Sequence, residues 1–426
     1  MDPKTLLSGM FEAAIDAARP ALVLPPVLPP RPASGRVVVI AAGKAAAAMA
    51  AAVETAWGGC EGLALTRYGH AVPTQTIEVV EAAHPVPDAA GQGAAQRILA
   101  LAESLGAGDT LVFLISGGAS ALLSAPLAAI TLAEKAALTR ALLASGATIG
   151  EMNSVRRHLS AAKGGRLAAA AYPARCLTYA ISDVPGDRPE VIGSGPTVAD
   201  PTTQADALAV LKKYRIEAPP SIAAVLSDPA FETPKPGDPR FAGNCYELIA
   251  TPQSMLSAAK AVAPLPCHLL GDAIEGEARE VGRVFAGLAR AVREGKSAFT
   301  APCILLSGGE TTVTLPQRAV EQAMEPATGK GGRNVEFLMG FASEIAGLKG
   351  VSALAGDTDG IDGAAPVAGA YVDGTTADRA RASGYTLSAA MAAYDGHGLF
   401  ERLGDQIVTG PTHTNVNDFR AILIEA

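Results

Sequence analysis

The hydrophobic pattern of this chain alternates between two periods along most of its length. Continuous apolar runs at 36–42, 110–116 and 176–182 are rich in Val, Ile and Leu, which is typical of strands buried on both faces. Between them lie segments with helical spacing, such as 89–106 and 131–146. The second segment opens with Thr131 and Glu134, the spacing of a capping box. The pattern predicts an α/β fold with a mostly parallel, doubly covered sheet.

The pattern breaks between residues 219 and 243, where Pro, Gly and Asp are dense. Strand and helix patterns then resume, with strands expected at 246–250, 267–271 and 303–307 and a long helix from Glu275 to about Glu294. A chain of 426 residues also exceeds the size of an ordinary single domain. We therefore predict two domains, residues 1–235 and residues 236–426.

Composition and charge exclude several classes of protein. The formal net charge is −8 with a pI near 5.4, so no nucleic-acid partner is expected. The 5 cysteines are dispersed, which argues against a disulfide framework or a zinc knuckle. No stretch reaches the roughly 18 apolar residues of a membrane helix, and the amphipathic start is unlike a signal peptide. We expect a soluble, cytoplasmic protein without a membrane partner.

One short motif occurs twice, each time directly after a predicted strand. SGGAS spans 116–120 and SGGETT spans 307–312. Ligands of parallel α/β sheets bind beyond the carboxyl ends of the strands, and glycine lets backbone N–H groups approach an anion. A tight turn between strand and helix is the alternative explanation for either copy alone. The candidate phosphate-binding residues are Ser116, Gly117, Gly118, Ser120, Ser307, Gly308 and Gly309.

Two cations lie within glycine-rich stretches. Lys44 follows Gly43 at the end of the first strand and opens an Ala-rich helix, where a cation opposes the helix dipole unless an anion binds there. Arg333 lies in GKGGRN (329–334), also before a helix, where its fork could meet a phosphate or a carboxylate. A solvated surface loop is the alternative for this second stretch. Gly331, Gly332 and Asn334 join the candidate phosphate-binding residues.

Acidic residues follow other predicted strands. Asp183 and Asp187 are candidates for a general base or a metal ligand, although one such acid could simply cap a helix. Asp357 and Asp359 lie in DTDGIDG, which fails the calcium-loop pattern at its fifth and twelfth positions. With Glu310 they are candidates to hold Mg²⁺, the alternative being solvated turns.

Taken together, these motifs resemble the glycerate 2-kinases of the MOFRL family, which carry a DUF4147 domain followed by a MOFRL domain. The resemblance extends from about residue 36 to the end and rests on motifs in a fixed order: GKAAAAMA, HPVPD, SGGASALL, MNSVRRHLSAAKGGRLA, SDVPGD, GSGPTVADPTT, SGGETTV, GKGGRN, AGDTDGIDG and TGPTHTNVND.

The resemblance implies a larger N-terminal Rossmann-like parallel α/β/α sandwich and a smaller C-terminal α/β domain with a mixed sheet. It implies ATP and Mg²⁺ as cofactors and phosphorylation of D-glycerate on its C2 hydroxyl in an interdomain cleft. It leaves room for a homodimer. Lys44 and Arg333 match the lysine and arginine proposed as key residues in the family.

The expected mechanism is phosphoryl transfer, in which the protein mainly aligns groups and neutralises charge. Lys44 and Arg333 would approach the γ-phosphoryl group or the glycerate carboxylate, and Asp183 or Asp187 would orient or deprotonate the acceptor hydroxyl. Members of the family have also been called hydroxypyruvate reductases, but GQGAAQ (91–96) and GSGPTV (193–198) lack the third glycine of a dinucleotide fingerprint. That reductase and a non-catalytic sensor of sugar acids or nucleotides remain the alternatives.

Overall fold

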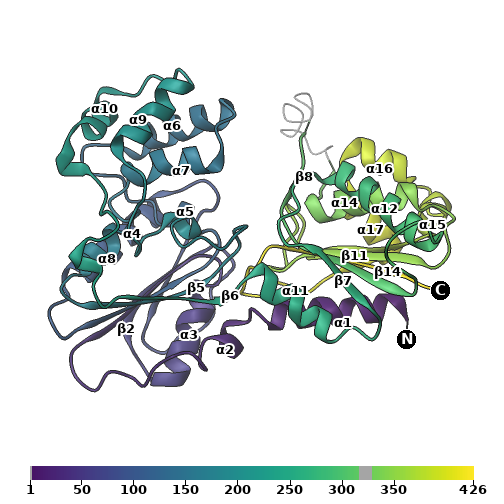
Figure 1. Cartoon of the computed structure of the whole chain (residues 1–426), viewed down its shortest axis with the longest axis horizontal. Coiled ribbons are helices and arrows are strands. Elements are labelled where there is room, and N and C mark those ends of the chain that lie inside the picture. Colours follow the sequence, from purple (N-terminus) through teal and green to yellow (C-terminus); the bar gives the residue numbers. More distant parts are fainter. Residues whose placement is uncertain (1, 316–328) are drawn as a thin grey trace. The chain divides into compact units, whose positions relative to one another are not determined.

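The computed structural model describes residues 2–315 and 329–426. The chain forms two compact units, one of residues 20–249 and one of residues 1–19 together with 250–426 (Figure 1). Each unit has its own sheet and its own buried core. The two units are described separately below.

The unit of residues 20–249 is built on a six-stranded sheet of order β3-β2-β1-β4-β5-β6. The pairs β1–β2, β2–β3, β1–β4 and β4–β5 are all parallel. The central strands β1 and β4 are buried along their whole length, as their continuous apolar runs predict. The strands are β1 (Val37–Ala42), β2 (Glu61–Arg67), β3 (Glu78–Ala82), β4 (Thr110–Ile115), β5 (Arg175–Ile181) and β6 (Cys245–Ala250).

Helices cover both faces of this sheet (Figure 1). Helix α3 packs on β1 and β2, whereas α4 and α8 enclose the opposite core with Val38, Ile40 and Phe113. A second apolar core joins α6, α7, α9 and α10. The helices are α2 (Pro20–Val23), α3 (Ala46–Trp57), α4 (Ala89–Glu103), α5 (Ala119–Leu122), α6 (Leu132–Ala144), α7 (Ile149–His158), α8 (Arg166–Ala171), α9 (Gln204–Lys213) and α10 (Pro220–Ser227), with short 3₁₀ turns η1 (Ile192–Ser194), η2 (Pro229–Phe231) and η3 (Pro239–Phe241).

The second unit contains a mixed six-stranded sheet of order β13-β12-β11-β14-β9-β7. The β7–β9 pair is parallel, whereas the pairs β9–β14, β14–β11, β11–β12 and β12–β13 are antiparallel. A two-stranded ribbon also joins β10 to β8. The strands are β7 (Cys267–Gly271), β8 (Gly276–Glu277), β9 (Cys303–Ser307), β10 (Thr311–Thr312), β11 (Val351–Asp357), β12 (Gly369–Asp373), β13 (Gln406–Ile407) and β14 (Asp418–Ile424).

Helices also cover both faces of the mixed sheet. Helices α12 and α14 pack against each other and close one core, whereas α1 and α11 lie on the other face (Figure 1). The helices of this unit are α1 (Pro3–Asp16), α11 (Pro252–Ala261), α12 (Ala278–Arg293), α14 (Arg333–Glu344), α15 (Thr376–Ala382), α16 (Leu387–Ala393) and α17 (Gly396–Leu403).

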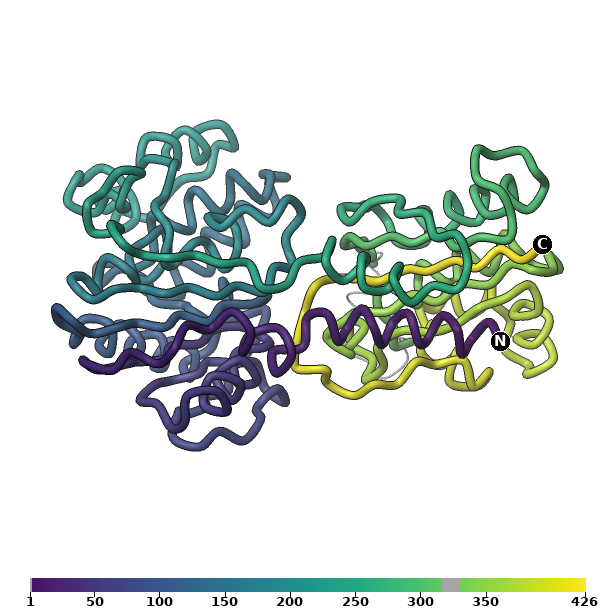
Figure 2. Tube along the Cα trace, turned by 60° about the horizontal axis from the view of Figure 1, so that its bottom comes forward, coloured from purple at the N-terminus to yellow at the C-terminus, as the bar shows by residue number. Residues whose placement is uncertain are grey.

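The N-terminal helix α1 completes the core of the C-terminal unit, alongside β11 and β14 (Figure 2). The Phe11 ring lies 5.3 Å from the Phe419 ring, and a Cβ atom at Gly356 would be only 3.0 Å from Phe11. The compact units therefore divide the chain differently from the predicted domains 1–235 and 236–426. The reason is that the apolar face of α1 is buried against the second sheet, a long-range contact that the local pattern does not encode.

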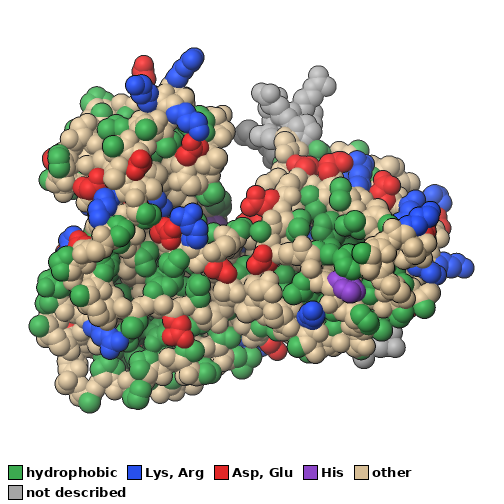
Figure 3. All heavy atoms as spheres, viewed as in Figure 1, with side chains coloured by type: hydrophobic (Ala, Val, Ile, Leu, Met, Phe, Trp, Pro, Cys, Tyr) green, Lys and Arg blue, Asp and Glu red, His purple; other side chains and the backbone are tan. Residues whose placement is uncertain are grey.

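The predicted fold class is confirmed: both units are α/β, the first with a parallel sheet and the second with a mixed one. The capping box at Thr131 and Glu134 is present at the start of α6. No helix in residues 2–315 and 329–426 is both long and apolar enough to cross a membrane. On the face drawn in Figure 3, basic and acidic side chains are interspersed.

Candidate active site

In the unit of residues 20–249, the carboxyl ends of β1 and β4 form one compact turn region. Lys44 N–H donates to Gly117 O (2.8 Å), and the buried Ser116 hydroxyl accepts from Ala45 N–H (3.0 Å). A Cβ atom at Gly43 would lie 2.3 Å from Ser116 Oγ, so only glycine fits between the two strands. Lys44 and the first SGG motif, each a candidate from the sequence, therefore lie side by side in this unit.

The N–H groups of Gly117 and Gly118 make no hydrogen bond within the part of the chain that the structure describes. Backbone N–H groups that have no acceptor within the protein, at the end of a strand, can donate hydrogen bonds to an anion. A Cβ atom at Gly118 would lie 3.4 Å from Lys44 Cγ and 3.2 Å from the His84 ring. Lys44 and His84 therefore flank the glycine turn.

His84, from the HPVPD motif, is neutral in this environment. Burial, followed by the charges of Lys44 and Arg67, lowers the pKa of His84 to about 4. A neutral imidazole beside a lysine adds no further repulsion to the turn.

Ser120 lies one helical turn further on and is tied to other segments. Its hydroxyl is 2.8 Å from Ser194 Oγ of the GSGPT motif and 3.1 Å from an Arg156 Nη atom. Lys163 Nζ donates both to Ser120 O (2.6 Å) and to Ser120 Oγ (3.1 Å). Ser120 thus connects the glycine turn with basic residues of the MNSVRRHLSAAKGG motif.

Asp183 and Asp187 lie on the loop that follows β5. Asp187 adopts a left-handed backbone (φ 51°) and its N–H donates to Val184 O (3.1 Å). One of its carboxylate oxygens is buried with no hydrogen-bond partner in the described residues. Such an oxygen is suited to accept a proton or a hydrogen bond from a ligand.

The second SGG motif differs from the first, because both backbone groups of Gly308 are hydrogen-bonded inside the protein. Gly308 N–H donates to Gly271 O (2.9 Å), and Gly308 O accepts from the buried Arg420 (3.0 Å). Gly309 O accepts from Asp418 N–H (3.3 Å). The expected phosphate cradle does not extend to the Gly308 amide, because β7 already occupies it.

Arg333 is the centre of an ionic cluster at the start of α14. Its Nε donates to both oxygens of Asp418 (2.8 and 3.0 Å), one Nη donates to Glu310 (2.6 Å), and the other donates to Asp357 (2.9 Å). Burial alone would lower the pKa of Arg333, but the charges of these carboxylates raise it well above its ordinary value. Three of its five N–H groups are thereby used, and the side chain is fixed in one orientation.

The predicted metal residues Glu310 and Asp357 thus contact Arg333 directly. Asp359 accepts from Ile361 N–H (2.8 Å), and its own N–H donates to Asp357 (3.0 Å). No group of three or more His, Cys, Asp or Glu side chains that could hold a metal ion occurs in residues 2–315 and 329–426. The expectation that Glu310 and one of Asp357 or Asp359 hold Mg²⁺ stays a prediction, and Glu310 and Asp357 are the two that share the Arg333 guanidinium.

The GKGGRN stretch is held in place by Asp362. This buried carboxylate accepts from Asn334 N–H (3.0 Å) and Val335 N–H (2.9 Å) at the start of α14. Burial raises the pKa of Asp362 to about 7. A Cβ atom at Gly332 would lie 2.4 Å from the Asp362 carboxyl carbon, so only glycine fits at this position.

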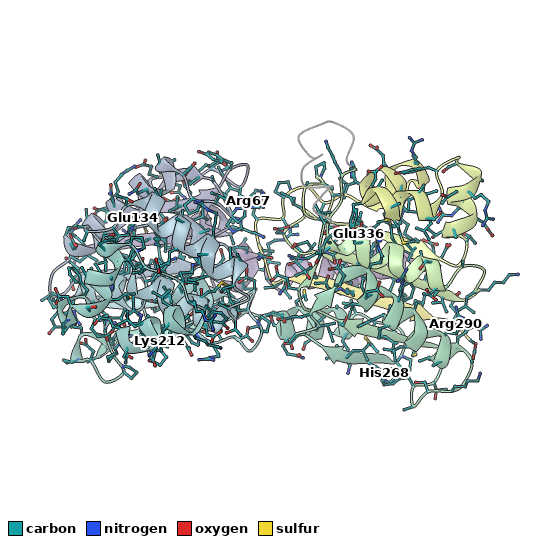
Figure 4. All side chains as sticks on the ribbon, turned by 90° about the horizontal axis from the view of Figure 1, so that it is seen from above. Arg67, Glu134, Lys212, His268, Arg290 and Glu336 are labelled. Carbon is teal, nitrogen blue, oxygen red and sulfur yellow. The ribbon has the colours of Figure 1, made fainter. Side chains whose placement is uncertain are left out.

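A cavity of about 350 Å³ opens beside Arg333 within the same unit. Its walls combine Val313, Leu315 and Tyr394 with the glycines of the GKGGRN stretch. Glu336, labelled in Figure 4, lies at its edge. An apolar cavity next to a fixed arginine is suited to a ligand that has both an apolar ring and an anionic group.

Sequence reasoning missed several polar residues of these two regions. Asp418 is a main partner of Arg333, and Asp362 positions the start of the same helix. Both residues lie in recognised motifs, but neither was among the predicted site residues. In the first unit, Lys135, Arg156 and Lys163 are largely buried around Ser120. A signal existed for Lys135, because it shares a helical face with the buried Leu138 and Leu142.

Known protein families and relatives match this chain along most of its length. The family model described as a domain of unknown function, DUF4147, matches residues 6–227, and the MOFRL family model matches residues 303–418. A protein from Agrobacterium vitis that bears a hydroxypyruvate reductase name is 51% identical over 429 residues, covering 99% of this chain and 94% of that protein.

Kinases are found among the relatives as well. The D-glycerate 2-kinase of Thermotoga maritima is 37% identical over 421 residues, covering 97% of each chain. A crystal structure of a glycerate kinase from that organism superimposes with a TM-score of 0.86, covering 99% of both chains at 37% identity. The order of the two matched models, the two-domain fold and these full-length relatives agree, and the chain belongs to the DUF4147–MOFRL family, that of the glycerate 2-kinases.

Proposed function

We propose that this protein phosphorylates the C2 hydroxyl of D-glycerate, with ATP and Mg²⁺, to give 2-phosphoglycerate and ADP. The relatives named glycerate kinase support this reaction class. The observation that carries the proposal is the ionic cluster around Arg333, because its charge suits a nucleotide that arrives with a metal ion.

The charge of that cluster can be counted from its contacts. Asp418, Asp357 and Glu310 face Arg333, and Asp418 also pairs with the buried Arg420 (2.7 Å). Three carboxylates against two guanidinium groups leave the cluster negative, so a bare triphosphate would be repelled. A triphosphate that carries Mg²⁺ would find carboxylate oxygens for the metal and the remaining Arg333 N–H groups for phosphoryl oxygens.

The donor set fits Mg²⁺ in chemical type. This ion commonly binds one or two protein carboxylates, with substrate phosphates and waters as its other ligands. Glu310 and Asp357 supply such carboxylates, and both contact one guanidinium group. When bound, Mg²⁺ would neutralise charge on the phosphates.

Lys44 and the first glycine turn supply the complementary groups. In the proposed reaction, the Gly117 and Gly118 N–H groups and the Lys44 ammonium stabilise the phosphoryl oxygens during transfer. Asp187, or Asp183 on the same loop, accepts the proton of the C2 hydroxyl. The proposed active site needs Lys44 and Arg333 to act on one substrate pair, as in the interdomain cleft expected from the sequence.

The direct test is a kinase assay on the purified chain with D-glycerate, ATP and Mg²⁺. We expect ADP release that depends on glycerate, and ³¹P NMR should identify 2-phosphoglycerate. Oxidation of NADH with hydroxypyruvate, without ADP release, would instead support the reductase reading. Binding of glycerate or ATP without turnover would instead indicate a non-catalytic sensor of sugar acids or nucleotides.

A variant pair tests the role of Arg333. Arg333→Gln should lower kcat by about 10²–10³-fold, the scale of losing one group that stabilises transition-state charge. The matched control is Arg381→Gln, since Arg381 is exposed and only pairs with Asp378 on the same helix. Near-normal kcat in folded Arg333→Gln would contradict the proposed role.

A further inference from the structure

A second cavity lies in the unit of residues 20–249, beside the first glycine turn. It has a volume of about 250 Å³, and none of the described residues that line it is acidic. Part of its wall is apolar and comes from Pro85, Val86, Leu132 and Leu143. Its polar part combines basic side chains with the hydroxyl groups of Ser120, Ser124 and Thr139. The asymmetry between an apolar wall and a basic wall is typical of a site for a small organic anion.

Four basic side chains line this cavity, and three of them are withdrawn from solvent, whereas Arg140 is exposed. Lys135 comes from α6, Arg156 comes from α7, and Lys163 comes from the turn before α8. The exposed fraction is 6% for Lys135 and 1% for Lys163. Arg156 and Lys163 both contact Ser120, within 3.1 Å of its hydroxyl oxygen.

These cations have no carboxylate partner within the described residues, although Arg156 and Lys163 donate hydrogen bonds to Ser120. Lys135 Nζ is buried and makes no hydrogen bond in residues 2–315 and 329–426. Within the same described ranges, none of the ion pairs involves Lys135, Arg156 or Lys163. Buried charges are normally paired or hydrogen-bonded, so a cluster of like charges at a cavity indicates a missing anion.

The electrostatics of the cluster agree with this geometry. Burial, followed by repulsion from Arg156, lowers the pKa of Lys135 to about 7. Burial, followed by Arg156 and Lys135, lowers the pKa of Lys163 well below its ordinary value. An anion in the cavity would reverse both effects by restoring a favourable partner for each ammonium group.

We propose that Lys135, Arg156 and Lys163, with Ser120, form the subsite that binds the carboxylate of the acceptor acid. This assignment rests on the proposed kinase function. It places the unreacting end of the acceptor on the three cations and leaves its hydroxyl end for the glycine turn, since Pro85 of the cavity wall follows His84, which borders Gly118 and Lys44.

The choice of a carboxylate over a nucleotide phosphate follows from the acidic residues. The Arg333 cluster contains carboxylates that suit a metal-bound phosphate, whereas the walls of this cavity contain none. A free carboxylate brings no metal ion and needs only donors and positive charge. A small three-carbon acid also suits the restricted volume better than a whole nucleotide does.

The test measures binding of each substrate separately by calorimetry, in a buffer without phosphate or sulfate. Lys135→Met removes one cation and keeps an unbranched side chain of similar length, and Arg156→Gln removes the second. We expect each variant to weaken D-glycerate binding and to raise the KM for glycerate by at least tenfold. The affinity for Mg·ADP should remain within about twofold, and glycerol, which lacks the carboxylate, should not bind measurably to the wild-type chain.

The matched control is Lys212→Met, because Lys212 is an exposed lysine on α9 of the same unit (Figure 4). It should leave both affinities unchanged. Unaltered glycerate affinity in Lys135→Met and Arg156→Gln would overturn the subsite. Loss of Mg·ADP affinity with glycerate affinity retained would overturn the carboxylate assignment and indicate a nucleotide phosphate instead.

These measurements distinguish failure of the carboxylate subsite from failure of the proposed kinase function. If the wild-type chain binds D-glycerate through these cations but releases no ADP, the kinase proposal fails while the anion subsite stands. If the wild-type chain is a glycerate kinase and the variants keep its KM, only the subsite fails. A purely structural role for Lys135 predicts a lower melting temperature in Lys135→Met with an unchanged KM, which would also overturn the subsite.

Discussion

Replacement of the buried Lys135 by Met should make the protein more stable while weakening its proposed acceptor site. Lys135 lies on the buried face of α6 with an exposed fraction of 6% and no hydrogen bond to its Nζ atom in the described chain. Its protonation in the folded state is opposed by burial and by Arg156. Met keeps the apolar part of the side chain and removes the charge.

The expected magnitude follows from the pKa of Lys135, which falls from its ordinary value of 10.5 to about 7. Below pH 7 the amine is protonated in both states, so the full cost of charging it in the folded protein applies. Between about pH 7 and 10.5 the unfolded chain binds more protons, so this cost falls as pH rises. At pH 7 the linkage gives a cost of about 4 kcal/mol, and relaxation around the site should reduce the measured gain to about 2–4 kcal/mol.

The assay is urea unfolding between pH 6 and pH 9 in a buffer without phosphate or sulfate. Trp57 is the only tryptophan of the chain and lies on α3 of the same unit as Lys135, so its fluorescence reports the relevant unfolding transition. The free energy of unfolding of Lys135→Met should exceed that of the wild-type chain at pH 7, and the difference should shrink towards pH 9. Lys212→Met should match the wild-type chain throughout.

Two results would refute this reasoning. The first is a Lys135→Met variant less stable than the wild-type chain at pH 7, which would mean that the ammonium group has a stabilising partner. The second is a difference in stability that does not change with pH, which would mean that folding does not lower the pKa of Lys135.

Three further predictions concern other parts of the two units. Lys44→Met should lower kcat in the kinase assay by about 10²–10³-fold, because the ammonium group is proposed to act on the transferred phosphoryl group. The unfolding transition reported by Trp57 fluorescence should not change. A normal kcat would refute the role of Lys44. Gly332→Ala should lower kcat, because a Cβ atom at Gly332 collides with Asp362 and displaces Arg333. Gly287→Ala on α12, at a site with no atom within 4 Å and no positive φ, should not lower it; equal activity of the two variants would contradict the packing argument. Phe11→Ala should destabilise the unit of residues 1–19 and 250–426 by about 3–5 kcal/mol, because the Phe11 ring loses its packing on Phe419. Calorimetry should show this as a lower melting temperature of one transition. An unshifted transition would show that α1 is not part of that core.

Much of the fold was predictable because its signal is local. The apolar run at 303–307 became β9 without change, and the run at 110–116 became β4 with one residue less. A strand buried on both faces of a parallel sheet must be apolar at every position, so the run itself identifies the strand. The capping box at Thr131 is local in the same sense, since its two residues are three positions apart.

The candidate site was predictable only where a local pattern marks the end of a strand. Lys44 and the first SGG motif could be placed together because both follow strands that a parallel sheet brings to one edge. The second SGG motif looked equivalent, yet its Gly308 N–H is bonded to Gly271. The two copies differ because β9 is paired with β7 and β14 in a mixed sheet, a neighbourhood that the motif does not reveal.

The sequence by itself determined the class of fold, the strand ends that bear glycine, and the two cations placed among them, because each depends on residues close together along the chain. Only the tertiary structure decided that Asp418 and Asp357 hold Arg333, that α1 belongs with the last strands, and that Lys135 meets Lys163 at a cavity. These pairings join residues far apart in the chain, and their energies depend on burial and distance, which no local pattern specifies.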